Sequence, residues 1–192
     1  MAEKRRADAR RNLDALLEAA KAVFAASGVD APAKEITDRA GVGVGTLYRH
    51  FPQRSDLVIA VLEREIDACA EAGAGLSADN PPDAALRKWI QRYTELVATK
   101  AGLASALQSS DTAHEALRAH FYERMSPVLG ELIRAARIRP DVGAADILHA
   151  VALLSHAVPG EGPGYGRHLV DVFIDGLRPA PEAIIRTTPA TA

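Results

Sequence analysis

The sequence predicts an all-α protein built from about nine helices in two domains. Apolar residues recur at helical spacing in the long segments, and no segment alternates polar and apolar residues as a strand does. Glycine and proline clusters separate these segments. Of the 192 residues 48% are apolar, which is enough for one substantial core or two small ones and excludes a disordered chain.

The sequence also argues against a membrane or secreted protein. No apolar run approaches the roughly 20 residues that span a bilayer, and the charged N-terminus leads into an amphipathic helix rather than a signal peptide. The single cysteine, Cys69, agrees with a reducing compartment, and its place on an apolar stripe predicts a core residue. We therefore expect a cytoplasmic protein without a membrane partner.

Three helices are expected at the N-terminal end of the chain. An apolar stripe predicts the first over about 7–26, and Gly28 ends it. The second and third are expected over about 33–40 and 44–51. Three aromatic side chains should close the core between them: Phe24, Tyr48 and Phe51.

The segment 35–51 has the pattern of a helix-turn-helix. Gly41-Val42-Gly43 supplies a left-handed cap, an apolar plug and a permissive start for the next helix. In that helix the residues at i, i+3, i+4 and i+7 should face the core: Val44, Leu47, Tyr48 and Phe51. Such a second helix lies in the major groove of DNA, with its N-terminal residues at base edges.

Fixed spacings relate a set of short motifs: Ala40-Gly41-Val42, Gly45-Thr46-Leu47-Tyr48, His50-Phe51, Arg54 and Leu57. They resemble the N-terminal signature of the TetR family of bacterial repressors, over roughly 13–62. A three-helix unit inside another all-α protein is the alternative. Two residues depart from the family, Gly43 and Pro32, where a serine or threonine is usual. The fold tolerates glycine at an N-cap and proline in a first turn, but each change removes a hydroxyl that could bond a phosphate.

A fourth helix, capped by Ser55, should link this motif to the rest of the chain and end near Ala72. The segment 73–82 is rich in Gly, Ala, Asn and Pro, which predicts a break at the domain boundary. We expect three parts: a DNA-binding domain with its connecting helix over 1–72, a ligand-binding and dimerisation domain over 73–178, and a flexible tail over 179–192.

Five helices are expected in the second domain, over about 83–99, 103–109, 112–138, 143–158 and 166–177. Ser126-Pro127 lies inside the third of them. Because proline lacks an N–H, it must kink or divide that helix, and we expect a kink.

The last two expected helices are apolar on more than one side. One side can pack on the preceding helices, but the other would be an exposed apolar patch unless a second subunit covers it. A homodimer would also match a two-fold operator, and the resemblance implies a four-helix dimer interface. A helix pair central to a monomer is the alternative. The expected interface residues are Leu148, Val151, Leu154, Leu169, Val170, Phe173 and Leu177.

Contacts to DNA divide into those that position the protein and those that specify sequence. The resemblance places three residues on phosphates, namely Tyr48, His50 and Arg54, and Lys34 is a further candidate. Sequence should be specified by the outward N-terminal residues of the third helix with Arg49, the only one able to make a bidentate contact to guanine. These specifying residues are Val44, Gly45, Thr46 and Arg49.

Basic charge is biased toward the end with the motif. Residues 1–64 carry 11 Lys and Arg against 9 Asp and Glu, a balance of +2, while the remainder of the chain carries a balance of −4. The extreme N-terminus concentrates this charge and is expected to touch phosphates or the minor groove as a basic arm. Its candidates are Lys4, Arg5 and Arg6.

No catalytic, metal or cofactor site is expected. His149 and His156 lie about 10.5 Å apart along one helix, too far to chelate one metal. The resemblance implies a regulatory pocket for a small, mostly apolar molecule in the second domain, although core packing explains each candidate residue as well. The expected lining is Trp89, Tyr93, Leu103, Leu107, Phe121, Met125 and Leu153.

These patterns predict a homodimeric, sequence-specific regulator of transcription. The resemblance implies a repressor that a small ligand releases from operator DNA by moving the fourth helix. An activator or a regulator without a ligand stays open. A small-molecule carrier or enzyme with a vestigial DNA-binding motif, and a protein-binding adaptor, are the alternatives from other classes.

Overall fold

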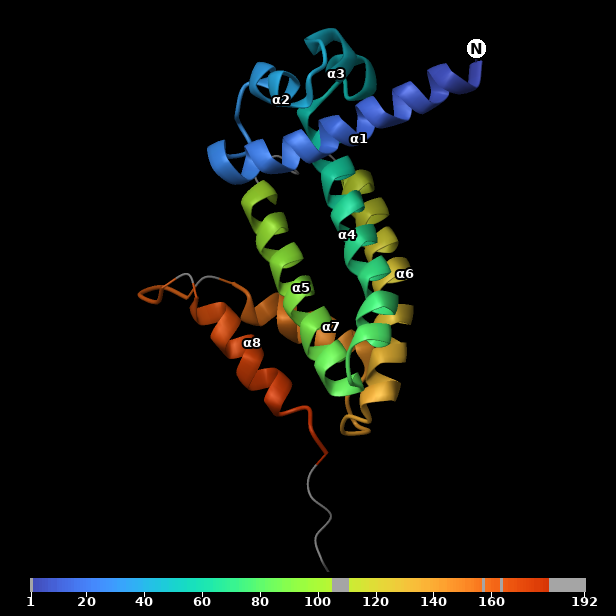
Figure 1. Ribbon diagram of the computed structural model, residues 1–192. Coiled ribbons are helices and arrows are strands. Elements are labelled where there is room, and N and C mark those ends of the chain that lie inside the picture. Colours follow the sequence, from blue (N-terminus) through green and yellow to red (C-terminus); the bar gives the residue numbers. More distant parts are fainter. Residues whose placement is uncertain (1, 105–110, 157, 163, 180–192) are drawn as a thin grey trace, which may run out of the picture.

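The computed structural model describes residues 2–104, 111–156, 158–162 and 164–179. Within these residues it contains eight α-helices and no strand, which confirms the all-α prediction (Figure 1). The short helix expected over 103–109 is not among the eight, since Leu103 ends the preceding helix and 105–110 lie outside the described residues. The tail expected over 179–192 also lies outside them, apart from Pro179.

Three helices form the head of the molecule: α1 (Ala2–Ser27), α2 (Ala33–Ala40) and α3 (Val44–His50). Their core combines aliphatic side chains from all three helices with Phe24 and Phe51. Tyr48 is 54% exposed, so the prediction that its ring closes this core is wrong. Val44 is exposed too, and Leu47 is the residue that α3 buries. A helix of two turns therefore has a narrower buried side than its spacing suggested.

α1 begins at Ala2, earlier than the expected start near Ala7. Lys4, Arg5 and Arg6 are therefore part of this helix, and their contact with DNA stays a prediction. Figure 1 shows this end of α1 projecting beyond the rest of the head.

α4 (Arg54–Asp79) runs from the head into the second domain as one helix of 26 residues. Its N-cap is Gln53 rather than the expected Ser55, and the Gln53 backbone N–H donates to Oδ2 of Asp56 at 2.9 Å. The helix continues through Gly73 and Gly75, so the break predicted over 73–82 is confined to the two residues before α5. Buried Gly73 lies where α4 meets α6, which is a packing role rather than a helix end.

The second domain contains α5 (Pro82–Leu103), α6 (Asp111–Ala136), α7 (Ala144–Leu154) and α8 (Tyr165–Asp175). α4, α5 and α6 lie side by side as a bundle, and α7 and α8 pack against α5 (Figure 1). α6 continues through Pro127 without being divided.

Two aromatic side chains tie the bundle together. The Trp89 indole N–H donates to the backbone carbonyl of Cys69 at 3.0 Å, which joins α5 to α4. The Tyr93 hydroxyl donates to the carbonyl of Leu148 at 3.0 Å, which joins α5 to α7. Burial raises the pKa of Tyr93 above its usual range. Because a buried polar group left unpaired costs about 1–3 kcal/mol, these bonds fix how the helices meet.

Candidate nucleic-acid interface and ligand-binding region

The turn between α2 and α3 is built by backbone hydrogen bonds. Gly41 has a φ of 69°, the left-handed conformation that favours glycine, and its N–H donates to the carbonyl of Asp38 at 3.3 Å. The N–H of Val42 donates to the carbonyl of Thr37 at 3.1 Å. Gly43 then caps α3 in an extended conformation, without a side-chain bond, as expected where serine is replaced. The turn holds α3 at a fixed angle to α2.

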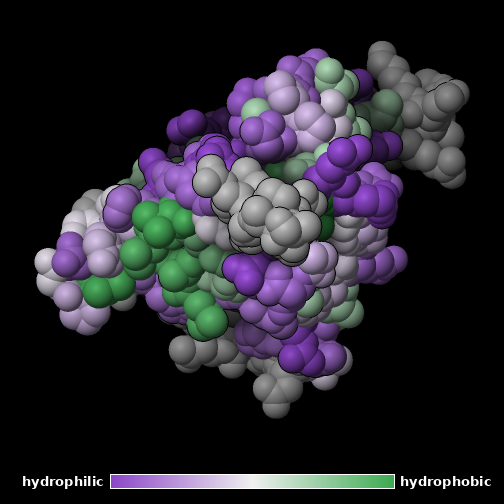
Figure 2. Space-filling model, turned by 90° about the horizontal axis from the view of Figure 1, so that it is seen from below, coloured by the Kyte–Doolittle hydropathy of each residue, from purple (hydrophilic) through white to green (hydrophobic). Residues whose placement is uncertain are grey.

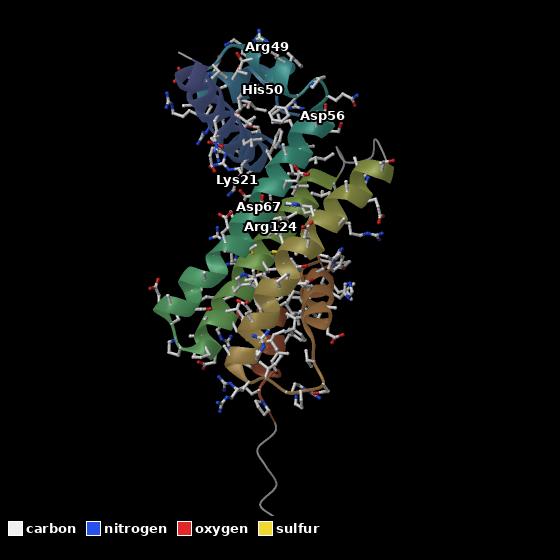
Figure 3. All side chains as sticks on the ribbon, turned by 90° about the vertical axis from the view of Figure 1, so that its right-hand side faces the viewer. Lys21, Arg49, His50, Asp56, Asp67 and Arg124 are labelled. Carbon is white, nitrogen blue, oxygen red and sulfur yellow. The ribbon has the colours of Figure 1, made fainter. Side chains whose placement is uncertain are left out.

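α3 presents most of its side chains to solvent. Leu47 is buried and anchors the helix to the head, while Thr46 is half-buried. The other predicted DNA-contacting residues of this helix are exposed: Val44, Gly45, Tyr48, Arg49 and His50. Figure 3 shows Arg49 at the outer tip of the head, with His50 nearer the body. The structure thus brings the six predicted residues of α3 together on one short, protruding helix.

Arg49 is exposed and has no ion pair within the described part of the chain, so its guanidinium is available to an external anion or base edge. Arg39, in the last turn of α2, is exposed and lacks such a pair in the same range. Sequence reasoning missed Arg39. Its place two residues before the glycine turn was the signal that could have found it, because a basic residue there lies close in sequence to the predicted DNA-contacting helix.

Arg54, predicted to contact a phosphate, also makes contacts within the head. Its Nη2 donates to the carbonyl of Ala31, and its guanidinium lies over the ring of Phe24, 5.5 Å from the ring centroid. The side chain is half-buried. Arg54 therefore fastens the start of α4 to the α1–α2 connection and positions the head.

Lys34 lies at the exposed start of α2 and forms an ion pair with Asp38, with Nζ and Oδ2 2.5 Å apart. Both side chains are largely in solvent, where such a pair contributes little stability. A DNA phosphate would compete with Asp38 for this lysine. Lys4, Arg5 and Arg6 lie in the first two turns of α1.

Most of the predicted ligand-lining residues are packed in the core. Trp89, Tyr93, Leu103 and Met125 are buried in one continuous apolar cluster, and Phe121 is half-buried with its ring centroid 5.7 Å from that of Tyr93. Leu153 is 72% exposed, so its assignment to an interior pocket is wrong. Leu107 lies outside the described residues. Aromatic and methionine residues at helical spacing therefore marked the core.

A cavity of about 420 Å³ lies elsewhere, between α5, the end of α7 and the start of α8. Several of its polar groups already have partners. The hydroxyls of Thr94 and Ser155 donate to backbone carbonyls of their own helices, and Nδ1 of His156 lies 2.8 Å from the carbonyl of Ala152. The remaining polar lining is charged or phenolic and comes from Glu95, Glu161, Tyr165 and Arg167. The cavity therefore combines a largely apolar wall with several charged side chains.

The predicted dimer residues divide into two groups. Four of them are buried within the chain's own core, so they are not available to a second subunit: Leu148, Val151, Val170 and Leu177. The other three are half-buried: Leu154, Leu169 and Phe173. The large apolar side chains that α7 and α8 expose are instead Leu153, at 72%, and Val172, at 56%. Figure 2 shows a hydrophobic patch on the side of the molecule where these helices lie.

The described part of the chain contains no group of His, Cys, Asp and Glu side chains arranged to hold a metal ion. None of the helices described combines the length and the apolarity needed to cross a membrane.

Comparisons with known proteins agree with this architecture. Residues 16–61 match the family "Bacterial regulatory proteins, tetR family", and residues 81–179 match "Transcriptional regulator SbtR-like, C-terminal domain". A helix-turn-helix-type transcriptional regulator of Staphylococcus aureus is 40% identical over 63 residues, which is 32% of this chain and only 34% of that protein.

Solved structures of other regulators match over nearly the whole fold. The TetR transcriptional regulator SCO0520 from Streptomyces coelicolor is 32% identical with a TM-score of 0.72, and the match covers 88% of this chain and 99% of that one. The TetR-like regulator LfrR from Mycobacterium smegmatis, solved in complex with proflavine, is 27% identical with a TM-score of 0.60, over 88% of this chain and 94% of that one. The chain belongs to the TetR family of bacterial transcriptional regulators.

Proposed function

We propose that the protein is a sequence-specific regulator of transcription that binds operator DNA through α3. The observation that carries the proposal is the exposure of five α3 residues around a single buried anchor, Leu47. An α-helix fits the major groove when its outer side chains are free to reach base edges. Arg49 and Thr46 specify sequence in this proposal, whereas Tyr48 and His50 contact phosphates.

The regulator acts as a homodimer in this proposal, with the apolar patch of α7 and α8 covered by a second copy. Support comes from Leu153 and Val172, whose large apolar side chains a monomer would leave in water. Both helices also bury their other side in the chain's own core, so a second copy would cover the side that is left exposed. The half-buried Leu154, Leu169 and Phe173 then complete the contact surface at its edge.

A small molecule releases the DNA in this proposal, by binding in the second domain and changing the position of α4. Family membership and the proflavine complex of LfrR support the existence of such an effector. The cavity beside α5 supports its location, because two carboxylates line it and proflavine-like cations would pair with them. The proposed compartment is the cytoplasm, where the operator is.

Fluorescence anisotropy tests the DNA-binding proposal. Operators are first selected from random DNA with the purified protein, and the affinity is then measured against a scrambled duplex across a salt series. We expect tight binding to the selected duplex at two subunits per site. Equal and steeply salt-dependent binding to both duplexes would contradict the proposal, because it would reflect phosphate contacts alone.

A proflavine titration tests the effector site. We expect quenching of the dye on binding to the wild-type protein, and weaker binding to a Glu95→Gln variant, because the substitution removes one carboxylate from the cavity wall. Glu115→Gln, on the exposed side of α6, is the matched control. If proflavine raises the melting temperature of a protein that selects no operator, the carrier or enzyme alternative is favoured instead.

A further inference from the structure

An ionic cluster joins α4 to α6 just below the head. Asp67 on α4 accepts a hydrogen bond from Nε of Arg124 at 2.6 Å, and Nε2 of His120 lies 3.3 Å from the same carboxylate oxygen. Nη2 of Arg124 also lies 3.6 Å from a carboxylate oxygen of Glu71. His120 and Arg124 are one turn apart on α6, so both reach α4 from one face.

This cluster is partly shielded from water. The side chains of Asp67, Arg124 and His120 are 40% exposed or less, and Nε2 of His120 is buried without a hydrogen bond in the described residues. Charges in such positions interact more strongly than pairs fully exposed to solvent. Two cationic or polar groups on one carboxylate also restrict its position more than a single pair does.

The same stretch of α4 holds the head through its other faces. Arg64 pairs with Glu18 of α1 at 2.9 Å and donates to the carbonyl of Asp14 at 2.8 Å. Glu65 pairs with Lys21 of α1 at 2.8 Å. Figure 3 shows Lys21 of α1, Asp67 of α4 and Arg124 of α6 one below another, where the head joins the second domain. Two turns of α4 are therefore bonded to α1 at one end and to α6 at the other.

We infer that the Asp67–Arg124–His120 cluster is the ionic joint through which α6 sets the position of α4 and hence of the DNA-binding head. This inference rests on the proposed function, because it names the residues that would carry a change in the second domain to the operator-binding helices. The three residues act as positioning residues, since none of them belongs to the helix-turn-helix or lines the cavity beside α5. Apolar packing between α4 and α6 persists without them, so the helices stay associated when the joint is broken.

The test variant is Arg124→Gln, which removes the charge and keeps most of the side-chain length. Arg118→Gln is the matched control, because Arg118 lies on the same helix but pairs within it, with Glu115 at 2.6 Å. The rescue variant reverses the pair as Asp67→Arg with Arg124→Asp. Each variant is measured at the same number of degrees below its own melting temperature, so that a loss of general stability is recognised.

Hydrogen exchange of the full-length, DNA-free protein is the first readout. In Arg124→Gln we expect exchange in α2, α3 and the first two turns of α4 to quicken by about fivefold, the lower end of typical coupling between sites. Arg118→Gln should leave these segments as in the wild type, and the reversed pair should restore them. Faster exchange confined to 67–71 and 120–124, or no restoration by the reversed pair, would overturn the inference.

Operator affinity is the second readout. We expect Arg124→Gln to weaken binding to the selected duplex by about fivefold or more and to leave binding to scrambled DNA unchanged. The substitution changes the position of the head and removes no positive charge from it. Equal affinity of Arg124→Gln and Arg118→Gln for the operator would overturn the inference. If the wild-type protein selects no operator, the regulator proposal fails, and the exchange experiment still decides the joint.

Discussion

A Cβ atom added to Gly73 of α4 would lie 2.3 Å from Cγ1 of Val128 of α6. The optimal separation of two non-bonded carbon atoms is at least about 3.5 Å, so only glycine at this position lets α4 and α6 come this near. We expect Gly73→Ala to lower the free energy of unfolding by about 1–3 kcal/mol through overpacking, measured by urea denaturation.

Gly75 provides the control for this variant, because the same addition there meets no described atom within 4 Å. Gly75→Ala should raise the free energy of unfolding by about 0.5–1 kcal/mol, since alanine favours a helix and restricts the unfolded chain. Shifts of the same sign in both variants would show that α4 and α6 do not meet closely at Gly73.

Arg49 and Arg54 should respond differently to alanine. Arg49→Ala removes an exposed guanidinium that has no ion pair among the residues the structure describes. We therefore expect unchanged stability and a loss of about 1–3 kcal/mol in binding to the operator, larger than the loss on scrambled DNA. Arg54→Ala removes the bond to the Ala31 carbonyl and the contact with Phe24, so it should lower the free energy of unfolding by about 1–2 kcal/mol.

Urea denaturation and anisotropy on both duplexes separate the two cases. Arg54→Lys should not restore stability, since lysine lacks the planar fork of the guanidinium. An Arg54→Ala protein as stable as the wild type, but weaker on all DNA, would return Arg54 to the predicted phosphate contact.

Arg137 stands in a left-handed conformation, with φ of 51°, directly after α6. A side chain in this region costs about 1 kcal/mol relative to glycine, which is the usual residue at this position after a helix. Arg137→Gly should therefore raise the midpoint of thermal unfolding, and Arg137→Ala should leave it nearly unchanged. A lower midpoint for the glycine variant would indicate that the exposed arginine makes a stabilising contact.

Cys69 makes the stability sensitive to alkaline pH. Burial raises the pKa of its thiol to about 12, whereas an unfolded thiol ionises near about 8.5. The native state holds the thiol proton more tightly than the unfolded state does. The contribution of the buried thiol to the free energy of unfolding is therefore complete below about pH 8.5 and is lost as the pH rises toward 12. The Cys69→Ala variant lacks the thiol, so it does not show this part of the loss of stability at alkaline pH.

The measurement is the urea midpoint of both proteins at pH 7.5 and pH 10. The stability advantage of the wild type should shrink at pH 10, and buried Tyr93 affects both proteins alike. The folded wild type should also resist a thiol reagent at pH 8 until urea unfolds it. An advantage that is constant between the two pH values would contradict the assignment.

Leu153 tests the proposed dimer. Leu153→Asp places a charge on the apolar patch, and we expect sedimentation equilibrium to show a monomer with a native circular dichroism spectrum. Ala116→Asp, at an exposed position of α6, should remain dimeric. A dimer that persists in Leu153→Asp would place the interface elsewhere.

The head could be predicted closely from sequence because its boundaries depend on local chemistry. α2 has the limits predicted, and the left-handed Gly41 occupies the predicted cap. α4 could not be predicted in full, since Gly73 has the composition of a break and its close packing on Val128 depends on a helix distant in sequence. The sequence near Gly73 does not predict its contact with Val128.

The second domain shows the same limit. Periodicity correctly indicated that α7 is apolar on two sides, but it could not tell Leu148, which faces the chain's own core, from Leu153, which faces solvent. Arg54 matched a family position, yet its contacts with Phe24 and Ala31 arise from folding of the head. The cavity beside α5 combines residues of α5, of α8 and of the segment between α7 and α8, whose arrangement the sequence pattern does not specify.

The uninterrupted length of α4 makes it a lever. Its 26 residues extend about 39 Å at 1.5 Å per residue. A tilt of about 5° at the far end therefore moves the head by about 3 Å, close to one base-pair step of about 3.4 Å. In a two-fold dimer the two heads move in opposite directions, so the half-site spacing of about 34–36 Å changes by nearly two base pairs. A small displacement of α4 in the second domain thus produces a loss of register between the two heads and the DNA.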